Sequence, residues 1–242
     1  MLSRTSKIPL YHQLYEIIRT EILTGDLEPG DMLPTENDLL TRYSVSRNTV
    51  RQALDALVSD GLIERHRGRG TFVSRPPIEQ GLSRIVSFTE DMRARGLEPG
   101  TEVLASEIIP APESIARALK IETGTELAHL KRLRLADGEP MSLEHSYLVH
   151  RHCPGVLERN YSSSPLRETL ERDYGIRLTR AEQTIRAAAA GGDTAHTLGV
   201  DPGAPLLTIE RTTYSDTGAA VEYLRILHRG DRYALYTELR DD

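Results

Sequence analysis

The chain has 242 residues, is 38% hydrophobic and 27% charged, and carries a formal net charge of −6. This length allows one large or two modest domains, and no run approaches the roughly 20 apolar residues that a membrane-spanning helix needs. The first residues show no apolar core with a small-residue cleavage site, so we expect no secretory signal and a cytoplasmic protein. The single cysteine, Cys153, excludes an internal disulfide and a cysteine-rich metal site.

The charge is unevenly distributed along the chain. Residues 1–75 hold ten Lys and Arg against ten Asp and Glu, whereas the remainder holds twenty against twenty-six. Within residues 42–75, seven arginines stand against three acidic residues, which leaves an excess of four positive charges. Because attraction to phosphate depends on the local field, this basic segment indicates a nucleic-acid partner more strongly than the overall charge does.

The first 43 residues predict two helices. Apolar residues recur at helical spacing over residues 9–24, with Pro9 suited to the first turn and Gly25 to the C-terminal cap. After a turn, Thr35 and Asp38 have the spacing of a capping box and open a second, short helix.

A third helix begins after a tight connection at residues 44–46, with Ser46 as its N-cap. Its apolar positions are close to the ideal spacing for one buried face, and we expect that face to comprise Val50, Ala53, Leu54, Leu57 and Val58.

Two short helices joined by a tight turn predict a helix-turn-helix motif. The expected core face of the third helix leaves Arg47, Asn48 and Arg51 on its outer side, near the N-terminus that usually meets base edges in a major groove. After Gly61, residues 62–65 and 71–73 predict a two-stranded wing. Its tip carries Arg67, Gly68 and Arg69 towards phosphates or a minor groove. On pattern alone, a solvated domain with surface arginines remains the alternative.

The sequence pattern changes after residues 74–84, in which Pro76 and Pro77 predict a linker. Beyond it, strands arranged in hairpins and interrupted by short helices predict an α+β domain built on an antiparallel sheet. The predicted strands cover residues 101–110, a hairpin over 126–149 that turns at 136–139, 176–190, a hairpin over 205–231 that turns at 215–218, and 233–240. The predicted helices cover residues 112–120, 164–175 and 193–200.

These stretches resemble the GntR family of bacterial transcription regulators, in its HutC branch. The segment "PLYHQLYEIIRTEILTGDLEPGDMLPTENDLLTRYSVSRNTVRQALDALVSDGLIERHRGRGTFV" carries the resemblance in the first part. In the second part, "SFTEDMRARGLEPG", "KRLRLADGEPMSLEHSYL" and "VEYLRILHRGDRYALY" are similar to the UTRA effector-binding domain, which shares the chorismate lyase fold. The resemblance implies a winged helix-turn-helix domain over residues 1–74, a linker over 75–83 and a UTRA domain over 84–242. It also implies a homodimer that binds a two-fold operator and releases it when a small effector binds. Members of the family usually act as repressors.

The resemblance also assigns the DNA contacts. It implies that the recognition helix contributes Ser46, Arg47, Asn48, Thr49 and Arg51, and that the wing tip contributes Arg67, Gly68 and Arg69. Position 37 departs from the family pattern, because it is Asn where many relatives carry an arginine that touches DNA.

Several polar residues of the second part suggest an anion pocket. Residues 87–92 predict the start of a helix. Its free backbone N–H groups either hold an anion or are satisfied by a capping box. Arg132 and Arg134 lie two apart on a strand and so share a face, which forms either a clamp for phosphate or carboxylate or a solvated surface. Glu144 and Glu222 either orient hydroxyl or ammonium groups of a ligand or neutralise the arginines.

Resemblance to relatives that sense phosphorylated sugars implies a set of effector contacts. Two departures keep ligands other than amino-sugar phosphates open: Pro165 replaces part of a Ser-Leu-Tyr pattern, and His228 stands where a tyrosine is frequent. The predicted effector contacts are Phe88, Thr89, Arg132, Arg134, Glu144, Ser164, Glu222 and His228.

The sequence also admits other functions. A shared fold with a lyase admits an enzyme, but we find no nucleophile motif, metal-ligand spacing or cofactor fingerprint, and we expect no metal and no cofactor. His145, His150 and His152 lie near Cys153, yet their mixed strand parity and loop setting argue against a metal site. The effector is alternatively a non-phosphorylated acid or sugar. A ligand-binding protein that has lost DNA binding is disfavoured by the intact arginine set.

Overall fold

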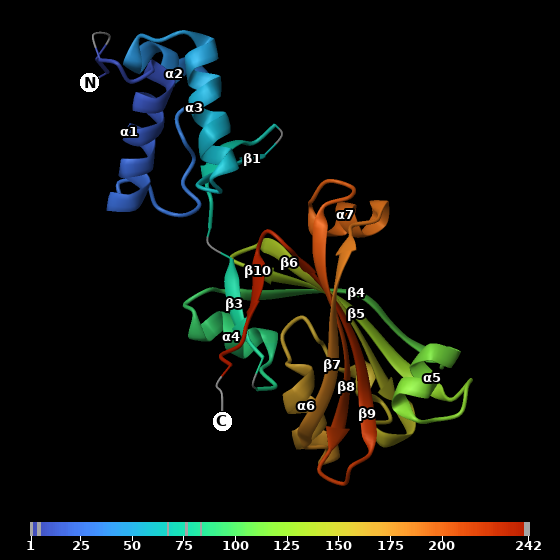
Figure 1. Ribbon diagram of the computed structural model, residues 1–242. Helices are drawn as coiled ribbons and strands as arrows, with labels where there is room; N and C mark the ends of the chain where they lie inside the picture. The colour runs from blue at the N-terminus through green and yellow to red at the C-terminus, as the bar shows by residue number, and fades with distance from the viewer. Residues whose placement is uncertain (1, 4–5, 67, 76, 83, 240–242) are drawn as a thin grey trace. The chain divides into compact units, whose positions relative to one another are not determined.

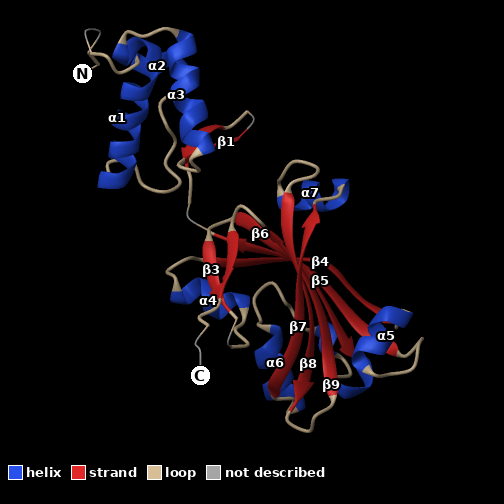
Figure 2. Ribbon diagram, viewed as in Figure 1, coloured by secondary structure: helices blue, strands red, loops and turns tan. Residues whose placement is uncertain are grey.

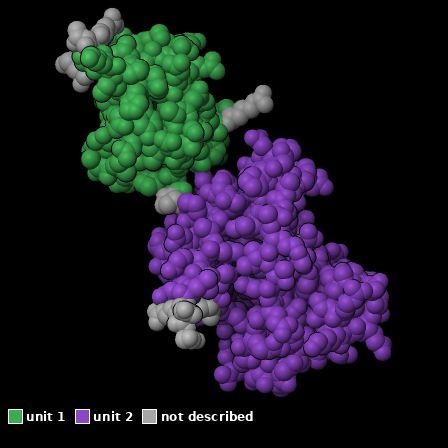
Figure 3. Space-filling model, viewed as in Figure 1, with its two compact units in different colours: residues 1–76 green, residues 77–242 purple. Residues whose placement is uncertain are grey.

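The computed structural model describes residues 2–3, 6–66, 68–75, 77–82 and 84–239. It divides into two units, residues 1–76 and residues 77–242 (Figure 3). Each unit has its own buried apolar core. In these described ranges, no helix is long and apolar enough to cross a lipid bilayer.

Three helices and a β-hairpin make up the first unit (Figure 1). The chain leaves the first helix through Gly25, whose φ of 83° is left-handed and therefore suits glycine. The predicted capping box is present: Thr35 Oγ1 accepts from Asp38 N at 3.3 Å, and Thr35 N donates to the Asp38 carboxylate at 3.0 Å. The elements are α1 (Leu10–Thr24), α2 (Glu36–Tyr43), α3 (Arg47–Ser59), β1 (Ile63–His66) and β2 (Gly70–Val73).

The core of the first unit follows the predicted stripe of α3 except at one position. Val50, Ala53, Leu54 and Leu57 are buried against α1 and α2. Val58 is 38% exposed, so its prediction as a core residue was wrong. Position 58 lies about 100° around the helix from position 57, beyond the edge of the face that the other two helices cover.

The second unit contains a six-stranded antiparallel sheet with the strand order β4-β5-β6-β9-β8-β7 (Figure 2). Hairpins β5–β6 and β8–β9 meet where β6 pairs with β9, and α5 and α7 lie at opposite ends of the sheet (Figure 1). The α+β class and the antiparallel sheet are thus confirmed. The strands are β4 (Pro99–Pro110), β5 (Glu126–Ala136), β6 (Glu139–Val149), β7 (Leu178–Ala189), β8 (Pro205–Ser215) and β9 (Ala220–Arg229). The helices are α4 (Phe88–Ala94), α5 (Glu113–Leu119), α6 (Leu166–Tyr174) and α7 (Gly192–Leu198), with short 3-10 turns η1 (His150–His152) and η2 (Val156–Glu158).

A small parallel sheet corrects the predicted linker. Residues 78–81, expected within the linker, form β3 (Ile78–Gly81), which pairs with β10 (Tyr233–Tyr236). A four-residue strand that follows two prolines has no periodicity of its own, and its partner lies about 150 residues later, so the sequence pattern gave no signal for it. The chain therefore joins the second unit within a few residues of Pro76.

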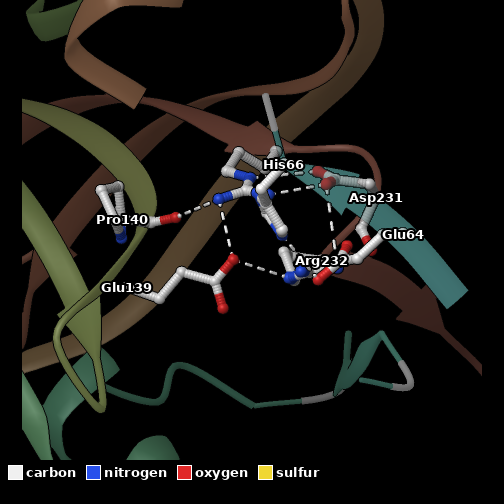
Figure 4. A network of polar contacts seen from close by, with 7 residues as sticks. Glu64, His66, Glu139, Pro140, Asp231 and Arg232 are labelled. Carbon is white, nitrogen blue, oxygen red and sulfur yellow. Dashed lines mark hydrogen bonds and ion pairs between the residues drawn. The ribbon is translucent and has the colours of Figure 1, made fainter. Parts of the chain in front are cut away.

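A network of charged side chains fixes the end of β9 and the start of β10 (Figure 4). Glu139 accepts from Arg229 Nη1 and from Arg232 Nε, both at 2.9 Å, and Asp231 lies 2.7 Å from Arg229 Nη2. Both arginines are buried, and such charge-assisted pairs hold buried guanidiniums firmly. The network thereby sets the position of Tyr233, the first residue of β10.

Candidate functional sites

The N-terminal turns of α3 carry the predicted base-reading residues. Ser46 caps this helix by accepting from Thr49 N at 3.2 Å, and its hydroxyl lies 2.9 Å from Thr49 Oγ1. Arg47, Asn48 and Arg51 are exposed beside this cap, while Thr49 is half-buried. The structure therefore brings all five residues to one end of α3.

Asn37 of α2 contacts the recognition helix directly. Its Oδ1 accepts a hydrogen bond from Arg47 Nη2 at 3.1 Å. The residue that departs from the family pattern thus positions one of the predicted DNA contacts, and this bond occupies only one guanidinium nitrogen of Arg47.

The wing is the antiparallel pair β1–β2, in register from Ile63 opposite Val73 to His66 opposite Gly70. Gly68 has a φ of 76° and is exposed with Arg69 at the hairpin tip, whereas Arg67 lies outside the described residues. Arg65 of β1 forms an ion pair with α3, because its Nη1 lies 2.6 Å from Asp55 Oδ1. This ion pair joins the wing to the recognition helix.

Five of the predicted effector residues lie on strands of the large sheet and line one cavity, namely Arg132, Arg134, Glu144, Glu222 and His228. Strand pairing puts Arg132 opposite Glu144 and Glu144 opposite Ile226, so β5, β6 and β9 present them in one row. Together with β3, α4 and α6, they enclose a cavity of about 100 Å³. Its polar lining comprises Gln80, Ser87, Thr89, Arg132, Arg134, Glu144, Arg167, Arg211, Glu222, His228 and Tyr233.

Arg134 is held from three sides. Its Nη1 donates to Thr101 at 2.8 Å and its Nη2 donates to Thr89 at 3.1 Å. The Phe88 ring lies under the guanidinium, with its centroid 4.7 Å from Cζ. The side chain of Arg134 is therefore aimed before any ligand is bound.

Glu144 bridges the two arginines. Its Oε2 lies 3.0 Å from Arg132 Nη2 and 3.7 Å from Arg134 Nε, and all three residues are no more than 7% exposed. Burial opposes ionisation of Glu144, but the guanidiniums of Arg134 and Arg132 outweigh it and lower the pKa of this carboxyl. Glu144 is therefore a carboxylate that balances the arginines.

Glu222 differs from Glu144 although both are buried. Burial raises the pKa of Glu222 in spite of the nearby Arg132 and Arg211, so protonation is easier here than at an exposed glutamate. The pocket thus contains one firmly ionised carboxylate and one that accepts a proton more readily.

His228 is 3% exposed and packs on Tyr233, with ring centroids 4.0 Å apart. Burial lowers the pKa of His228 to about 4, although Glu144 acts in the opposite direction. Neither ring nitrogen has a hydrogen-bond partner among the described residues, and the same holds for Nε of Arg132 and of Arg134. A pocket wall with several unused polar groups is typical of a site that a ligand completes.

Some residues differ from the prediction. Ser164 is half-buried and stands outside the cavity lining, which includes the neighbouring Pro165 instead. At the start of α4, Ser87 Oγ accepts from Glu90 N at 3.2 Å and Ser87 N donates to Glu90, so the capping box is present. Arg211 and Tyr233 line the cavity but were missed, because strand alternation alone does not reveal which face is concave.

The histidines considered for a metal do not come together. His145 Nδ1 lies 3.2 Å from His129 Nε2 on the sheet, whereas His150 and His152 belong to η1. Over the part of the chain that the structure describes, no group of three His, Cys, Asp or Glu side chains has a metal-binding arrangement.

Both units match known protein families. Residues 10–73 match the family of "bacterial regulatory proteins, gntR family", and residues 94–234 match the UTRA domain. The repressor NagR of Bacillus subtilis is 39% identical over 232 residues, which cover 96% of this chain and 95% of NagR. The Escherichia coli repressor MngR is 32% identical over 225 residues, which cover 93% of each chain.

PhnF, a transcriptional repressor of Mycolicibacterium smegmatis, is similar in both sequence and structure. It is 34% identical over 220 residues, which cover 90% of this chain and 89% of PhnF. Its crystal structure aligns with a TM-score of 0.67 at 32% identity and covers 96% of this chain and 99% of that one. The chain therefore belongs to the GntR family, with HutC-like repressors as relatives, and is a ligand-responsive DNA-binding regulator with a UTRA effector domain.

Proposed function

We propose that this protein is a homodimeric repressor that leaves its operator when a small anionic metabolite, best matched by a sugar phosphate, binds in the cavity beside Arg132 and Arg134. The observation that carries the proposal is the pair of buried guanidiniums balanced by the single carboxylate of Glu144. An anion supplies a second negative partner and acceptors for their unused donors.

The polar groups around this pair support a phosphorylated or acidic sugar. Thr89 adds a hydroxyl beside Arg134, while Glu144 and Glu222 offer acceptors for sugar hydroxyls. Relatives are named as repressors of a mannosyl-D-glycerate transport and metabolism system and of fructoselysine utilization. Mannosyl-D-glycerate joins a sugar to a carboxylic acid, so a non-phosphorylated sugar acid is the alternative effector.

The DNA-binding role rests on the exposed side chains of the first unit. In this proposal Ser46, Arg47, Asn48, Thr49 and Arg51 meet the major groove, where an arginine reads guanine through two hydrogen bonds. The wing residues Arg67, Gly68 and Arg69 meet the backbone or the minor groove. The domains proposed are residues 1–76 for DNA and 77–242 for effector and dimer, and the site of action is the cytoplasm.

The cavity offers a route from effector to DNA. Gln80 of β3 and Ser87 and Phe88 at the start of α4 line it, and they lie within a dozen residues of the end of the first unit. In this hypothesis, an anion that reorders this segment alters the spacing of the two DNA-binding domains in a dimer, so that they no longer fit the operator. A full reversal of the population needs about 5.5 kcal/mol of preference for the released state.

A thermal-shift screen tests the effector class. Because a ligand that binds only the native state raises Tm, phosphorylated and unphosphorylated forms of each sugar are compared on wild type and on Arg134→Ala. The proposal expects stabilisation by phosphorylated forms that Arg134→Ala abolishes, while the exposed control Arg117→Ala retains it. Equal stabilisation by a phosphorylated sugar and by its neutral, unphosphorylated form would contradict an anionic effector. The named relatives are regulators. If the protein converted any stabilising ligand to a product, a lyase-like enzyme activity would be favoured instead.

A further inference from the structure

We infer that a second anion-binding site adjoins the first, and that the effector carries a second anionic group which occupies it. This inference rests on the proposed function of the Arg132–Arg134 cavity and specifies the chemical class of its ligand. It starts from a second pocket, of about 450 Å³, that shares Ile85, Arg167, Leu178 and Arg211 with the first.

The first cavity is small for a metabolite. The cavity beside Arg134 measures about 100 Å³. Ligand sites generally measure roughly 300–1,000 Å³. A metabolite anchored at Arg134 must therefore extend beyond this cavity, and the shared lining makes the second pocket the space into which it extends.

The second pocket is also strongly basic. The second pocket is lined by four arginines, and none of its described lining residues is acidic. Arg180 is already neutralised, because its Nη1 pairs with Glu182 and its guanidinium stacks 3.8 Å from the Tyr214 ring centroid. Arg84, Arg167 and Arg211 have no carboxylate within ion-pair distance among the described residues.

The contacts of these arginines leave donors for a ligand. Arg167 Nη1 donates to the carbonyl of Ile85 at 2.8 Å, and Arg211 Nε donates to Gln183 at 3.0 Å. Both bonds fix the direction of a guanidinium while its remaining nitrogens stay available. Arg211 also lies near Glu222 and Glu144, so its charge is partly balanced from the first cavity, whereas Arg84 and Arg167 are not balanced in this way.

The chemistry that fits is an oxyanion, carboxylate or phosphate, held by forked donors. A molecule with an anionic group at each end, such as a phosphorylated sugar acid, would place one end at Arg134 and the other at Arg84 and Arg167. A simple sugar monophosphate would leave the second set of guanidiniums without a partner.

Isothermal titration of the full chain with inorganic phosphate tests both sites. We expect two phosphates per wild-type chain, and one for either Arg134→Gln or the double variant Arg84→Gln with Arg167→Gln. Each loss should weaken the affected site about tenfold or more, because a hydrogen bond to a charged group contributes roughly 1.5–3 kcal/mol. The control, Arg117→Gln with Arg186→Gln, removes the same charge from exposed pairs elsewhere and should keep both phosphates.

The outcomes separate the two proposals. A single phosphate that only Arg134→Gln abolishes would overturn the second site and leave the proposed function standing. A single phosphate that only the double variant abolishes would overturn the proposed function, and with it an effector anchored at both sites. No binding would overturn both proposals. 6-Phosphogluconate should displace both phosphates from wild type. Displacement of only one would mean that the second site binds a separate anion rather than a second group of the effector.

Discussion

Replacing Glu144 by Gln should destabilise the free protein and strengthen its response to an anion. The carboxylate lies 3.0 Å from Arg132 Nη2 and 3.7 Å from Arg134 Nε, and it is the ionised group that balances both guanidiniums. Glutamine keeps the shape and an acceptor oxygen but removes the charge, so the two buried guanidiniums lose the carboxylate that balances them.

The expected loss of stability follows from the burial of Glu144, Arg132 and Arg134. Removing one partner of a buried pair costs about 3–5 kcal/mol, and the retained acceptor places this change near 3 kcal/mol. For a unit of this size, each kcal/mol shifts Tm by roughly 2–4 °C, so the free variant should melt roughly 6–12 °C below wild type. A bound phosphate replaces the missing charge and should recover most of this difference.

Differential scanning calorimetry of both proteins, with and without saturating phosphate, measures the effect. Glu113→Gln is the matched control, because Glu113 pairs with Arg117 at 2.6 Å on the exposed surface, where such a pair contributes little. If Glu144→Gln melts with wild type, or if phosphate raises Tm equally in both, Glu144 does not balance the arginines and the reasoning fails.

Three further predictions concern DNA recognition and pH. Arg47→Ala or Arg51→Ala should lose about 1–3 kcal/mol of sequence discrimination, whereas Arg69→Ala should weaken specific and random duplexes alike; equal losses in anisotropy titrations would refute this division. Ser46→Ala should lower the free energy of unfolding of the first unit by about 1 kcal/mol, because it removes the cap bond to Thr49, as urea unfolding would measure. The pKa of His228 is about 4 against an ordinary 6.5, so the native state binds fewer protons than the unfolded chain between these values and stability falls as pH drops through this window. His228→Phe should remove up to about 3 kcal/mol of that acid sensitivity, and an unchanged pH profile would contradict the assignment.

Local signals in the sequence predicted most of the elements. The caps at Thr35 and Ser46 are short-range hydrogen bonds written into neighbouring residues, and the structure confirms both. The two-residue spacing of Arg132 and Arg134 likewise placed them on one face of β5. These predictions succeeded because each depends on the geometry of a single helix or strand.

The features that the sequence did not predict depend on partners far away in the chain. Strand β3 exists because β10 pairs with it, and Val58 is exposed because of where α1 and α2 stop covering α3. Arg211 lies in the pocket because β8 pairs with β9, which a pattern within β8 cannot show. The sequence shows Asn37 only as a departure from the family pattern, whereas packing of α2 on α3 makes it a partner of Arg47.

Operator affinity with and without effector tests the central claim most directly. Fluorescence anisotropy would follow a labelled two-fold duplex for wild type, Arg132→Ala and Arg134→Ala, each with a stabilising sugar phosphate and with its unphosphorylated form. The account predicts a wild-type dimer whose affinity falls steeply with salt and with the phosphorylated ligand. It also predicts that both variants bind the operator but ignore the ligand. Release that persists in both variants, or release of wild type by the neutral sugar, would contradict the account.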